Sequence, residues 1–536
     1  MEWKKVTNAN TVKEFVLEKT GKPFDDIIKP TGDRFDRFEE AKKLLYSEIK
    51  KGTMISLVSD YDSDGINSTV IMTMLFEILK AKFELIIPKR ISEGYGLSDK
   101  IVERIKPGNL VITVDNGITA VSQIERLKLS GCKVVVMDHH EAENQLPIAD
   151  VLIDPSAIGE ADYCNYCGAG IAYRFAEYIL GKEHPVLPIL SCFAAIGTIG
   201  DVVELSGDNR TIVSEGLSNI KKGIGTEGLK RLCEKARIDE SSCAMDVAFN
   251  VVPVLNAPGR LYDDGAKHSV ISMYCNDINM ATEYVNNLVE INGERQKMVK
   301  RIMECIDIDG MIKSKDKAII LLNDDIPLGI VGIIAGQISE KTNRPAFVFS
   351  HTPEGTLKGS VRSKSKDYSI IEIIRKAQKH LIACGGHAKA AGLELKEENL
   401  KSFVNCIKRY LPEVEVMDYI PYDLEVATGL LPIVARQIIG LEPCGEGLPS
   451  PVIRITCKPV SNKNGENYSF MGDKKQHIRF FLPGNITAIC FNYENIIGKK
   501  LEGEIKSVDI IGRISENVYK GNKNIQIIVK DFRVSC

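Results

Sequence analysis

Aspartates and histidines follow short apolar segments at several points in the first 200 residues. Asp60, Asp62 and Asp64 alternate in the sequence Asp-Tyr-Asp-Ser-Asp-Gly directly after residues 54–59. The same placement recurs at three further points: Asp115 after residues 110–114, Asp138-His139-His140 after 133–137, and Asp154 after 151–153. Carboxylate oxygens combined with one imidazole suit Mn²⁺ or Mg²⁺, whereas a structural zinc site would favour thiolates.

Carboxylates at this density need a counter-charge, because like charges a few ångströms apart raise one another's pKa and weaken the fold. A pair of divalent cations resolves this conflict. Two such ions about 3.5–4 Å apart activate a water and stabilise the leaving oxygen at a phosphoryl centre. The pattern therefore predicts two-metal hydrolysis of a phosphate ester.

A single aspartate after a strand is more often a helix cap or a turn residue than a metal ligand. This structural role is the simpler interpretation of Asp154, which precedes Pro155. The alternating aspartates from Asp60 to Asp64 have no comparable structural rationale, so we interpret them as ligands.

These side chains need a scaffold that brings the ends of several segments together. Five short runs rich in β-branched residues are expected to be strands: 54–59, 84–87, 110–114, 133–137 and 151–153. Helical patterns lie between them, as at 68–82 and 119–130. This alternation indicates a parallel sheet with helices on both faces, and the carboxyl ends of such strands face one crevice. Asp201 ends an apolar stretch, 186–200, that we expect to be a buried helix.

The rest of the chain divides into further units. Apolar positions of helical spacing from Ile278 to Met303 predict one long connecting helix. A second α/β unit begins near Lys317. Beyond Pro421 short strands dominate, and five are expected, at 452–457, 477–482, 486–491, 504–511 and 524–529, which suggests a small closed β-barrel such as an OB-fold. The predicted domains are residues 1–275 (catalytic unit with a helical extension), 276–310 (connecting helix), 311–412 (second α/β unit) and 413–536 (barrel).

The motifs, in this order, resemble those of the DHH phosphoesterases. Four segments match the catalytic motifs of that family: 60–65, 115–117, 138–140 and 200–201. Later segments resemble the RecJ branch of the family: Leu255 to Arg260, the DHH-associated domain at 358–363 and 385–392, and the start of the RecJ OB-fold at 443–447. The resemblance covers nearly the full length and implies a single-stranded-DNA exonuclease.

The resemblance also implies a role for each residue of the acidic set. Asp60 and Asp62 would hold the first metal ion, and Asp64, His139 and Asp201 would hold the second. Asp115 would bridge the two ions. Asp138 would orient the histidines. His140 would lie against the scissile phosphate and help to stabilise the transition state.

Other residues match RecJ positions that bind the substrate, including its terminal 5′ phosphate. They are Arg90, Ser360, Arg362, Gly385, Gly386 and His387. An arginine binds phosphate through two parallel charge-assisted hydrogen bonds, and a Gly-Gly turn lets backbone amides approach a phosphate closely. Without the resemblance, a solvated surface arginine would be an equally good interpretation of Arg90, and an ordinary turn would be the better interpretation of the two glycines.

The predicted barrel has the composition of a single-strand-binding surface. Between Arg454 and Arg533, fourteen basic residues face eight acidic ones, and phenylalanines are interleaved with them. Basic charge with aromatic platforms holds a single strand without reading its sequence. Most of the phenylalanines are expected in the core, and His477 and Arg479 are the exposed candidates for contact with DNA.

The overall composition limits the class of protein. A formal net charge of −3 excludes a general polycation that coats nucleic acid. The fourteen cysteines show no framework of paired spacings, and the absence of an apolar leader or a membrane-length segment predicts free thiols in the cytoplasm. We expect a monomer that binds single-stranded DNA and no membrane. A RecQ-like helicase and a single-strand-binding protein are the partner classes that the resemblance suggests, although the sequence identifies neither.

Three functions remain open at this point. The first is a metal-dependent 5′→3′ exonuclease that releases 5′-mononucleotides from single-stranded DNA in recombination and repair. The second is a DHH phosphodiesterase acting on short oligoribonucleotides or cyclic dinucleotides, whose relatives typically lack the C-terminal barrel. The third is a non-enzymatic scaffold, against which the intact acidic set argues, because unused clustered carboxylates only cost stability.

Overall fold

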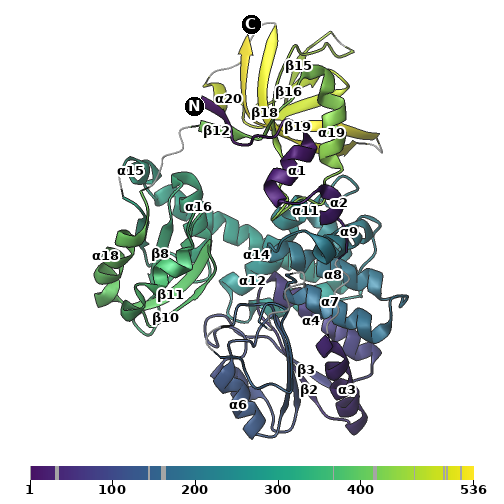
Figure 1. Ribbon diagram of the computed structural model, residues 1–536, viewed down its shortest axis with the longest axis vertical. Helices are drawn as coiled ribbons and strands as arrows, with labels where there is room; N and C mark the ends of the chain where they lie inside the picture. The colour runs from purple at the N-terminus through teal and green to yellow at the C-terminus, as the bar shows by residue number, and fades with distance from the viewer. Residues whose placement is uncertain are drawn as a thin grey trace.

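The structure, a computed structural model, consists of three lobes, the first two of which are joined by one long helix (Figure 1). It describes residues 2–30, 36–142, 145–157, 165–314, 316–365, 367–413, 419–463, 465–498, 501, 505–519 and 522–535. In Figure 1 the N-terminal sheet lies at the bottom, the second α/β unit at the left and the C-terminal sheet at the top. Both ends of the chain lie in the top lobe.

A five-stranded sheet forms the N-terminal lobe. Its strands, in spatial order, are β3 (Phe83–Ile86), β2 (Ile55–Val58), β4 (Leu110–Val114), β5 (Lys133–Met137) and β6 (Val151–Ile153). Every neighbouring pair is parallel. Helices α4 (Ser63–Ile78) and α7 (Gly168–Leu180) cover one face, and α5 (Asp99–Arg104) and α6 (Val121–Leu129) cover the other. The predicted parallel sheet with helices on both faces is confirmed.

Helix α4 begins five residues before the predicted start at Ser68. Asp62 is its N-cap, and the carboxylate accepts hydrogen bonds from the backbone N–H groups of Asp64 and Gly65. Aspartate and glycine are poor residues for a helix interior, so the sequence pattern placed the start too late. The alternating aspartates therefore form the turn from β2 into the first turn of α4.

A helical extension follows the first sheet. It comprises α8 (Leu187–Gly200), α9 (Gly207–Lys221), α10 (Glu227–Lys235), α11 (Ala244–Asp246), a π-helical turn η1 (Val247–Val251), α12 (Val252–Leu261) and α13 (Gly265–Tyr274). Helix α8 is the buried apolar helix that the sequence predicts. Across the ranges described above, no helix combines the length and the apolar character needed to cross a membrane.

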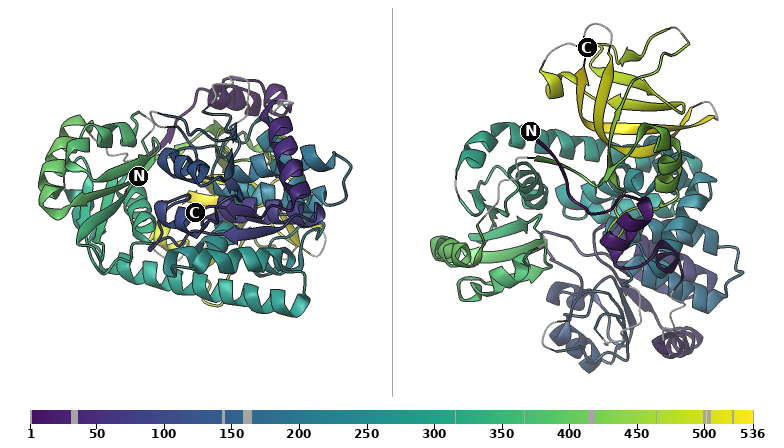
Figure 2. Two further views of the ribbon diagram at one scale, coloured as in Figure 1. Left: turned by 90° about the horizontal axis from the view of Figure 1, so that it is seen from below. Right: turned by 45° about the horizontal axis from the view of Figure 1, so that its top comes forward.

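The predicted connecting helix is α14 (Ile278–Cys305), whose 28 residues span about 42 Å. It continues through the polar stretch in its middle and links the helical extension to the second α/β unit, as the left view of Figure 2 shows. Its buried residues, among them Ala281, Val285 and Leu288, repeat at helical spacing. Short α15 (Ile308–Lys313) follows it.

The second α/β unit contains a mixed sheet. In spatial order the strands are β10 (Ala383–Gly386), β11 (Ala390–Lys396), β9 (Thr356–Arg362), β8 (Ala346–His351) and β7 (Ile319–Leu322). Only the pair β7–β8 is parallel in this sheet. Helices α16 (Val331–Thr342), α17 (Ile370–Arg375) and α18 (Leu400–Tyr410) pack on it. The carboxyl ends of β9 and β10, near Arg362 and His387, point toward the first lobe.

The C-terminal lobe is a curved seven-stranded sheet around one core, which is the OB-type unit that the sequence predicts. In spatial order the strands are β13 (Leu424–Glu425), β14 (Val452–Cys457), β18 (Ser507–Tyr519), β19 (Asn522–Ser535), β17 (Ile486–Cys490), β16 (His477–Leu482) and β15 (Tyr468–Met471). Five of these strands were predicted. The short strands β13 and β15 were missed, because two to four residues carry little pattern.

The first residues of the chain belong spatially to the C-terminal lobe. Strand β1 (Glu2–Lys5) pairs in parallel with β12 (Tyr419–Tyr422), and α1 (Val12–Thr20) contributes Phe15 and Val16 to the C-terminal core. The Trp3 indole N–H donates to a carboxylate oxygen of Asp531 at 2.6 Å. The sequence-based division assigned these residues to the first domain, since pairing between residues so far apart has no local signal.

Candidate active site

The acidic residues predicted from the sequence meet at one edge of the first sheet. Asp60 and Asp62 follow β2, Asp115 follows β4, and Asp138 to His140 follow β5, while Asp201 caps the end of α8. Three sets place one ligand atom of each member within 4.8 Å of one another: Asp60, Asp62 and Asp115; Asp64, His139 and Asp201; and Asp115, Asp138, His139 and His140. Residues more than 140 positions apart therefore share one site.

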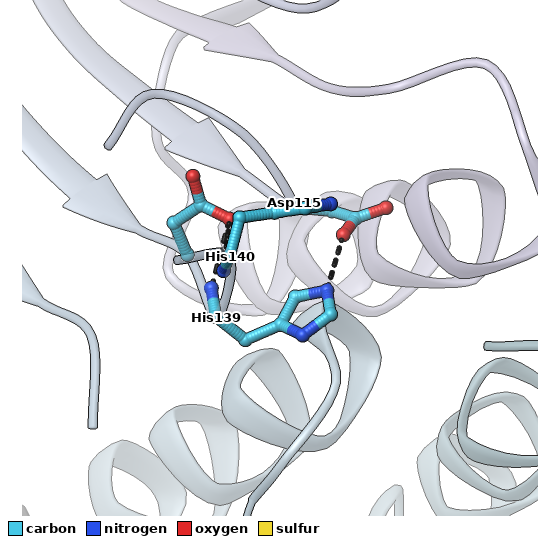
Figure 3. Close-up of side chains that lie close together, drawn as sticks. Asp115, His139 and His140 are labelled. Atoms are coloured by element: carbon cyan, nitrogen blue, oxygen red, sulfur yellow. Dashed lines mark hydrogen bonds and ion pairs between the residues drawn. The ribbon is translucent and has the colours of Figure 1, made fainter. Parts of the chain in front are cut away.

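His139 and Asp115 lie where the first two sets meet. The Nε2 atom of His139 is 3.1 Å from Oδ1 of Asp115, 3.8 Å from Oδ2 of Asp64 and 3.7 Å from Oδ2 of Asp201. Figure 3 shows the imidazole of His139 facing the Asp115 carboxylate. An aspartate in this position has an oxygen available to each set, as a bridging ligand requires.

Burial and mutual repulsion oppose ionisation of these carboxyl groups. Burial, followed by the neighbouring carboxylates, raises the pKa of Asp60, of Asp62 and of Asp115. The same causes raise the pKa of Asp201 to about 8. Within the described residues, Oδ1 of Asp60 is buried and has no hydrogen-bond partner. An oxygen-rich, negatively charged and unsatisfied cluster of this kind fits a pair of hard divalent cations.

The two histidines have opposite electrostatic surroundings. Burial and the neighbouring His140 lower the pKa of His139 to about 4, so its neutral ring can act as a ligand. Burial disfavours a charged His140, but the carboxylate of Asp138 outweighs it and raises the pKa of His140 to about 9. Nδ1 of His140 donates to Asp138 at 2.7 Å. The structure thus separates a neutral imidazole from an imidazolium in adjacent residues.

Hydrogen bonds hold two of the aspartates in place. Both carboxylate oxygens of Asp64 accept backbone N–H groups from the start of α7, those of Gly168 at 2.6 Å and Ala169 at 2.9 Å. Asp138 accepts from its two histidine neighbours and from the backbone N–H of Ile118 at 2.9 Å. These contacts overcome the effect of burial and lower the pKa of Asp138 to about 2.

The backbone is strained at two positions in the site. Asp115 and Val202 both have φ of +60°, a left-handed conformation that is uncommon for residues other than glycine and a genuine outlier for a β-branched one. Such conformations persist where the surroundings over-determine them, and they cluster at functional sites. Gly65 is required for a different reason, since a Cβ atom there would lie 2.6 Å from the carbonyl oxygen of Asp60.

Two side chains without a role assigned from the sequence belong to the site. The hydroxyl of Tyr95 donates to the backbone carbonyl of Asp115 at 3.1 Å and lies 3.1 Å from Nε2 of His140. Arg260, at the end of α12, is half-buried, and burial together with Arg90 lowers its pKa to about 10. Arg260 lies in the segment Leu255 to Arg260 that resembles the RecJ branch, but the contacts of both residues depend on the tertiary fold.

The predicted substrate residues of the second α/β unit face the acidic cluster. Ser360 and Arg362 lie within β9, and Nη1 of Arg362 donates to the Ser360 hydroxyl at 2.9 Å. Burial, followed by the charge of Arg90, lowers the pKa of Arg362. The ring of His387 stacks on that of His140 with centroids 6.3 Å apart. Residues of the two lobes therefore border one space.

The remaining predicted substrate residues are Arg90, Gly385 and Gly386. The guanidinium of Arg90 lies over the ring of Tyr61, 4.6 Å from its centroid. Gly385 and Gly386 end strand β10, and a Cβ atom on Gly386, whose φ is +140°, would lie 2.4 Å from the carbonyl oxygen of Ala390. The Gly-Gly turn therefore depends on glycine.

Asp154 has the structural role that the sequence favoured. Its Oδ1 atom accepts backbone N–H groups of Ser156 and Ala157, each at 3.0 Å. It belongs to none of the three ligand sets. A strand-end aspartate outside the cluster is a useful control for the aspartates inside it.

The candidate DNA-contacting residues of the barrel lie close together. The ring of His477 contacts Phe491 edge-on at 5.2 Å, and Phe491 is 52% exposed. Phe480 is fully buried, as expected of a core residue. His477 and Arg479 are half-buried rather than exposed, because neighbouring strands of the sheet cover part of each side chain.

The raised pKa values predict how stability depends on pH and metal. Above about pH 6.5 the folded protein binds more protons than the unfolded chain, because Asp201 and His140 titrate near 8 and 9, and stability therefore falls as the pH rises. Cations bind the ionised carboxylates, so their stabilising effect grows with pH. In calorimetry with EDTA, the melting temperature should fall between pH 6.5 and 8.5, and Mn²⁺ should raise it most at pH 8.5.

A matched variant separates the site from the rest of the protein. Asp201→Asn removes a carboxyl group whose raised pKa contributes to the loss of stability at high pH, and it also removes one metal ligand. Both the fall of the melting temperature in EDTA and its rise with Mn²⁺ should therefore be smaller. A melting temperature that rises with pH in EDTA would contradict the proposed ionisation.

Comparison with known proteins agrees with this geometry. Residues 54–198 match the DHH family, N-terminal domain, residues 315–413 match the DHHA1 domain, and residues 423–531 match the RecJ OB domain. The single-stranded-DNA-specific exonuclease RecJ of Thermus thermophilus is 30% identical over 508 residues, which cover 92% of this chain and 70% of that protein.

Further relatives show the same likeness. The exonuclease of the same name from Bacillus subtilis is 31% identical over 532 residues, covering 94% of this chain, so that this chain spans 65% of the length of that relative. The crystal structure of Thermus thermophilus RecJ in complex with Mn²⁺ superposes with a TM-score of 0.76 at 28% identity, covering 96% of this chain and 74% of the other.

Proposed function

Since this chain belongs to the RecJ family, we propose that it is a metal-dependent exonuclease that degrades single-stranded DNA from its 5′ end and releases 5′-mononucleotides. The observation that carries the proposal is the convergence of five aspartates and a neutral histidine on one buried cluster. The relatives matched by this chain are named as single-stranded-DNA-specific exonucleases. The one from Thermus thermophilus was crystallised both with Mn²⁺ and with Mg²⁺. A role in DNA recombination and repair belongs to the same proposal.

The ligand sets divide between two cation positions. Asp60 and Asp62 would hold one Mn²⁺ or Mg²⁺ ion, Asp64, His139 and Asp201 would hold the other, and Asp115 would contact both. When bound, a pair of such cations lowers the pKa of an attacking water and stabilises the leaving oxygen of the phosphodiester. The backbone bonds to Asp64 and the N-cap geometry of Asp62 orient these ligands in advance.

His140 is placed to stabilise negative charge on the reacting phosphate. Its ring is held as an imidazolium by Asp138, and its Nε2 edge is occupied by the Tyr95 hydroxyl in the absence of substrate. A phosphate oxygen that replaced this hydroxyl would receive a charge-assisted hydrogen bond. Tyr95 is a positioning residue in this scheme, since it also anchors the strained backbone of Asp115.

The arginines beside the cluster supply a site for the terminal 5′ phosphate. Burial, followed by the charges of Arg90 and Arg362, lowers the pKa of Arg260, and a bound anion would join Asp62 in offsetting the repulsion among these arginines. Ser360 already accepts a hydrogen bond from Arg362, and the ring of His387 stacks on that of His140. The strand's first nucleotide would thus lie between the arginines and the metal ligands.

A product-length assay tests the proposed activity. Single strands labelled at the 3′ end and carrying a 5′ phosphate should yield a ladder that shortens from the 5′ end in Mn²⁺ or Mg²⁺, whereas EDTA should stop the reaction. Arg362→Ala should raise KM for 5′-phosphorylated strands about 10–100-fold, since a charge-assisted bidentate contact is worth about 1.5–3 kcal/mol. It should leave KM for 5′-hydroxyl strands nearly unchanged. Intact 5′-phosphorylated strands after incubation with either metal would contradict the activity itself.

The alternative is a phosphodiesterase for short oligoribonucleotides or cyclic dinucleotides. The complete OB-type lobe, with Phe491 and His477 on its surface, favours long strands over these small substrates. Turnover of a dinucleotide and of a long single strand should be compared at equal enzyme concentration. Faster turnover of the dinucleotide would support the alternative.

The predicted partners beyond single-stranded DNA follow from family likeness alone. A RecQ-like helicase would supply unwound strands, and a single-strand-binding protein would keep them extended. The monomeric state and the cytoplasmic location are predictions of the same kind. Sedimentation of the purified protein, alone and mixed with each partner, tests binding to the helicase, binding to the single-strand-binding protein and the monomeric state.

A further inference from the structure

Large apolar side chains are exposed between the metal ligands and the C-terminal lobe. Phe249 is 72% exposed, Val202 is 63% exposed and Met245 is 37% exposed. Scattered apolar residues on a surface are ordinary. These three define a track from the barrel to the acidic cluster, because Met245 and Phe249 lie four positions apart on one helical run and Val202 directly follows the ligand Asp201.

The two ends of the track are fixed by contacts. At the barrel end, Met245 accepts a contact from Nη1 of Arg513 in β18 through its sulfur atom, at 3.6 Å. At the other end, Val252 packs against the end of α8, since a Cβ atom on Gly200 would lie 3.4 Å from its side chain. Asp201, a predicted metal ligand, follows Gly200 directly. Figure 1 shows α11 below the C-terminal sheet and α12 beside α14.

Phe249 lies between these two contacts. Residues 244–261 form one continuous helical run through α11, η1 and α12, and the seven steps from Met245 to Val252 span about 10 Å. The turn η1 that carries Phe249 packs against α8. Its aromatic ring is thus presented to solvent within about two helical turns of both the barrel and the end of α8.

The opposite end of the same run reaches the proposed 5′-phosphate site. Arg260, near the end of α12, interacts electrostatically with Asp62, Arg90 and Arg362. Phe249 precedes Arg260 by eleven positions, about 16 Å along the helix, and Val252 between them packs against Gly200, which directly precedes the ligand Asp201. A strand whose 5′ phosphate binds the arginines would pass the metal ligands and then Phe249 on its way to the barrel.

Local backbone geometry marks this region as specialised. The turn η1 is π-helical, and single π-helical turns inside α-helices occur frequently at functional sites. Val202 keeps a left-handed conformation that disfavours a β-branched residue. The turn η1 contributes no residue to the three ligand sets, whereas Val202 directly follows the ligand Asp201.

We propose that Phe249 is a stacking platform for a nucleobase on the 3′ side of the scissile bond. The inference rests on the proposed function and assigns it a substrate contact. An exposed aromatic ring offers its face to any base, which gives affinity for a single strand without sequence preference. A base in a duplex is already stacked and paired, so the platform favours unpaired strands.

Abasic substrates test the platform directly. The substrates are 5′-phosphorylated single strands of one sequence, each with a single abasic residue at a successive position from the 5′ end. For the unaltered protein, one position or two adjacent positions should show KM raised about tenfold by loss of the base. Phe249→Ala should raise KM for the intact strand by about the same factor, and at those positions the abasic residue should have no further effect.

Matched variants separate aromatic stacking from a merely apolar contact. Phe249→Tyr keeps the aromatic face and should behave as the unaltered protein, whereas Phe249→Leu keeps an apolar side chain and should behave as Phe249→Ala. Leu129→Ala removes a side chain that is 82% exposed at the end of α6 and should leave KM unchanged. Melting temperatures of all variants should agree, because each changed residue is exposed.

The outcomes also distinguish the platform from the activity. An unaltered protein that degrades no single strand contradicts the proposed function. An active protein whose Phe249→Ala variant matches Leu129→Ala on every substrate overturns the platform alone. An abasic penalty that persists at every position in Phe249→Ala would likewise overturn it, and would leave an interface with another protein as the use of this surface.

Discussion

Asp115→Asn should reduce kcat by at least about 10³-fold and leave binding of single strands almost unchanged. The reason is that Asp115 belongs to the set containing Asp60 and lies 3.1 Å from His139 of the set proposed for the second cation. Asparagine preserves the shape but removes the negative charge, so both cation positions lose a ligand. A loss of about 4 kcal/mol in transition-state stabilisation corresponds to this factor.

Two measurements and one control check this result. Calorimetric titration with Mn²⁺ should show weaker binding at both positions for Asp115→Asn, but at only one for Asp60→Asn. Asp154→Asn, at the end of a neighbouring strand, should retain full activity, since Asp154 stabilises a turn instead. Normal metal binding in Asp115→Asn would show that the bridge is assigned to the wrong residue.

His140→Ala should lower kcat by about 10²–10³-fold, the usual cost of removing one group that stabilises transition-state charge. KM for a phosphorylated strand should change little, because the arginines that bind the 5′ phosphate are untouched. Mn²⁺ affinity should also persist, since His140 is absent from the two sets assigned to the cations. Single-turnover kinetics at saturating strand concentration would measure the effect on the chemical step.

The adjacent histidine supplies the control. His139→Ala removes a neutral imidazole that lies within 4 Å of three carboxylates, so it should weaken Mn²⁺ binding as well as turnover. High Mn²⁺ concentration should restore part of the activity of His139→Ala and none of that of His140→Ala. Equal rescue of the two variants would mean that their roles are not separate.

The acidic cluster was predictable because each of its members follows a strand or a helix in a parallel α/β arrangement. The topology of such a sheet brings strand ends to one edge regardless of how far apart they lie in the sequence. Recognising three strands in the sequence was enough to place Asp60, Asp115 and Asp138 in the cluster, and the structure contains all three strands. The position of Asp201 followed from the apolar helix α8, which was also evident in the sequence.

Other parts of the site had no signal of this kind. Tyr95 and Arg260 reach the cluster from a loop and from the end of a helix, and nothing in their immediate sequence reports the distance to Asp115 or Asp62. Val202 looks like an ordinary core residue in the sequence, yet its side chain is exposed and its backbone strained. Such properties arise from tertiary contacts, which override local preference.

The position of residues 2–27 against the C-terminal lobe has a consequence for synthesis. Phe15 and Val16 are synthesised about 500 residues before Phe532, which belongs to the core that covers them. At roughly 5–20 residues per second, about half a minute to two minutes separates these events. During that interval the nascent segment must remain unfolded or be bound by a chaperone, so it reaches its final position long after its own synthesis.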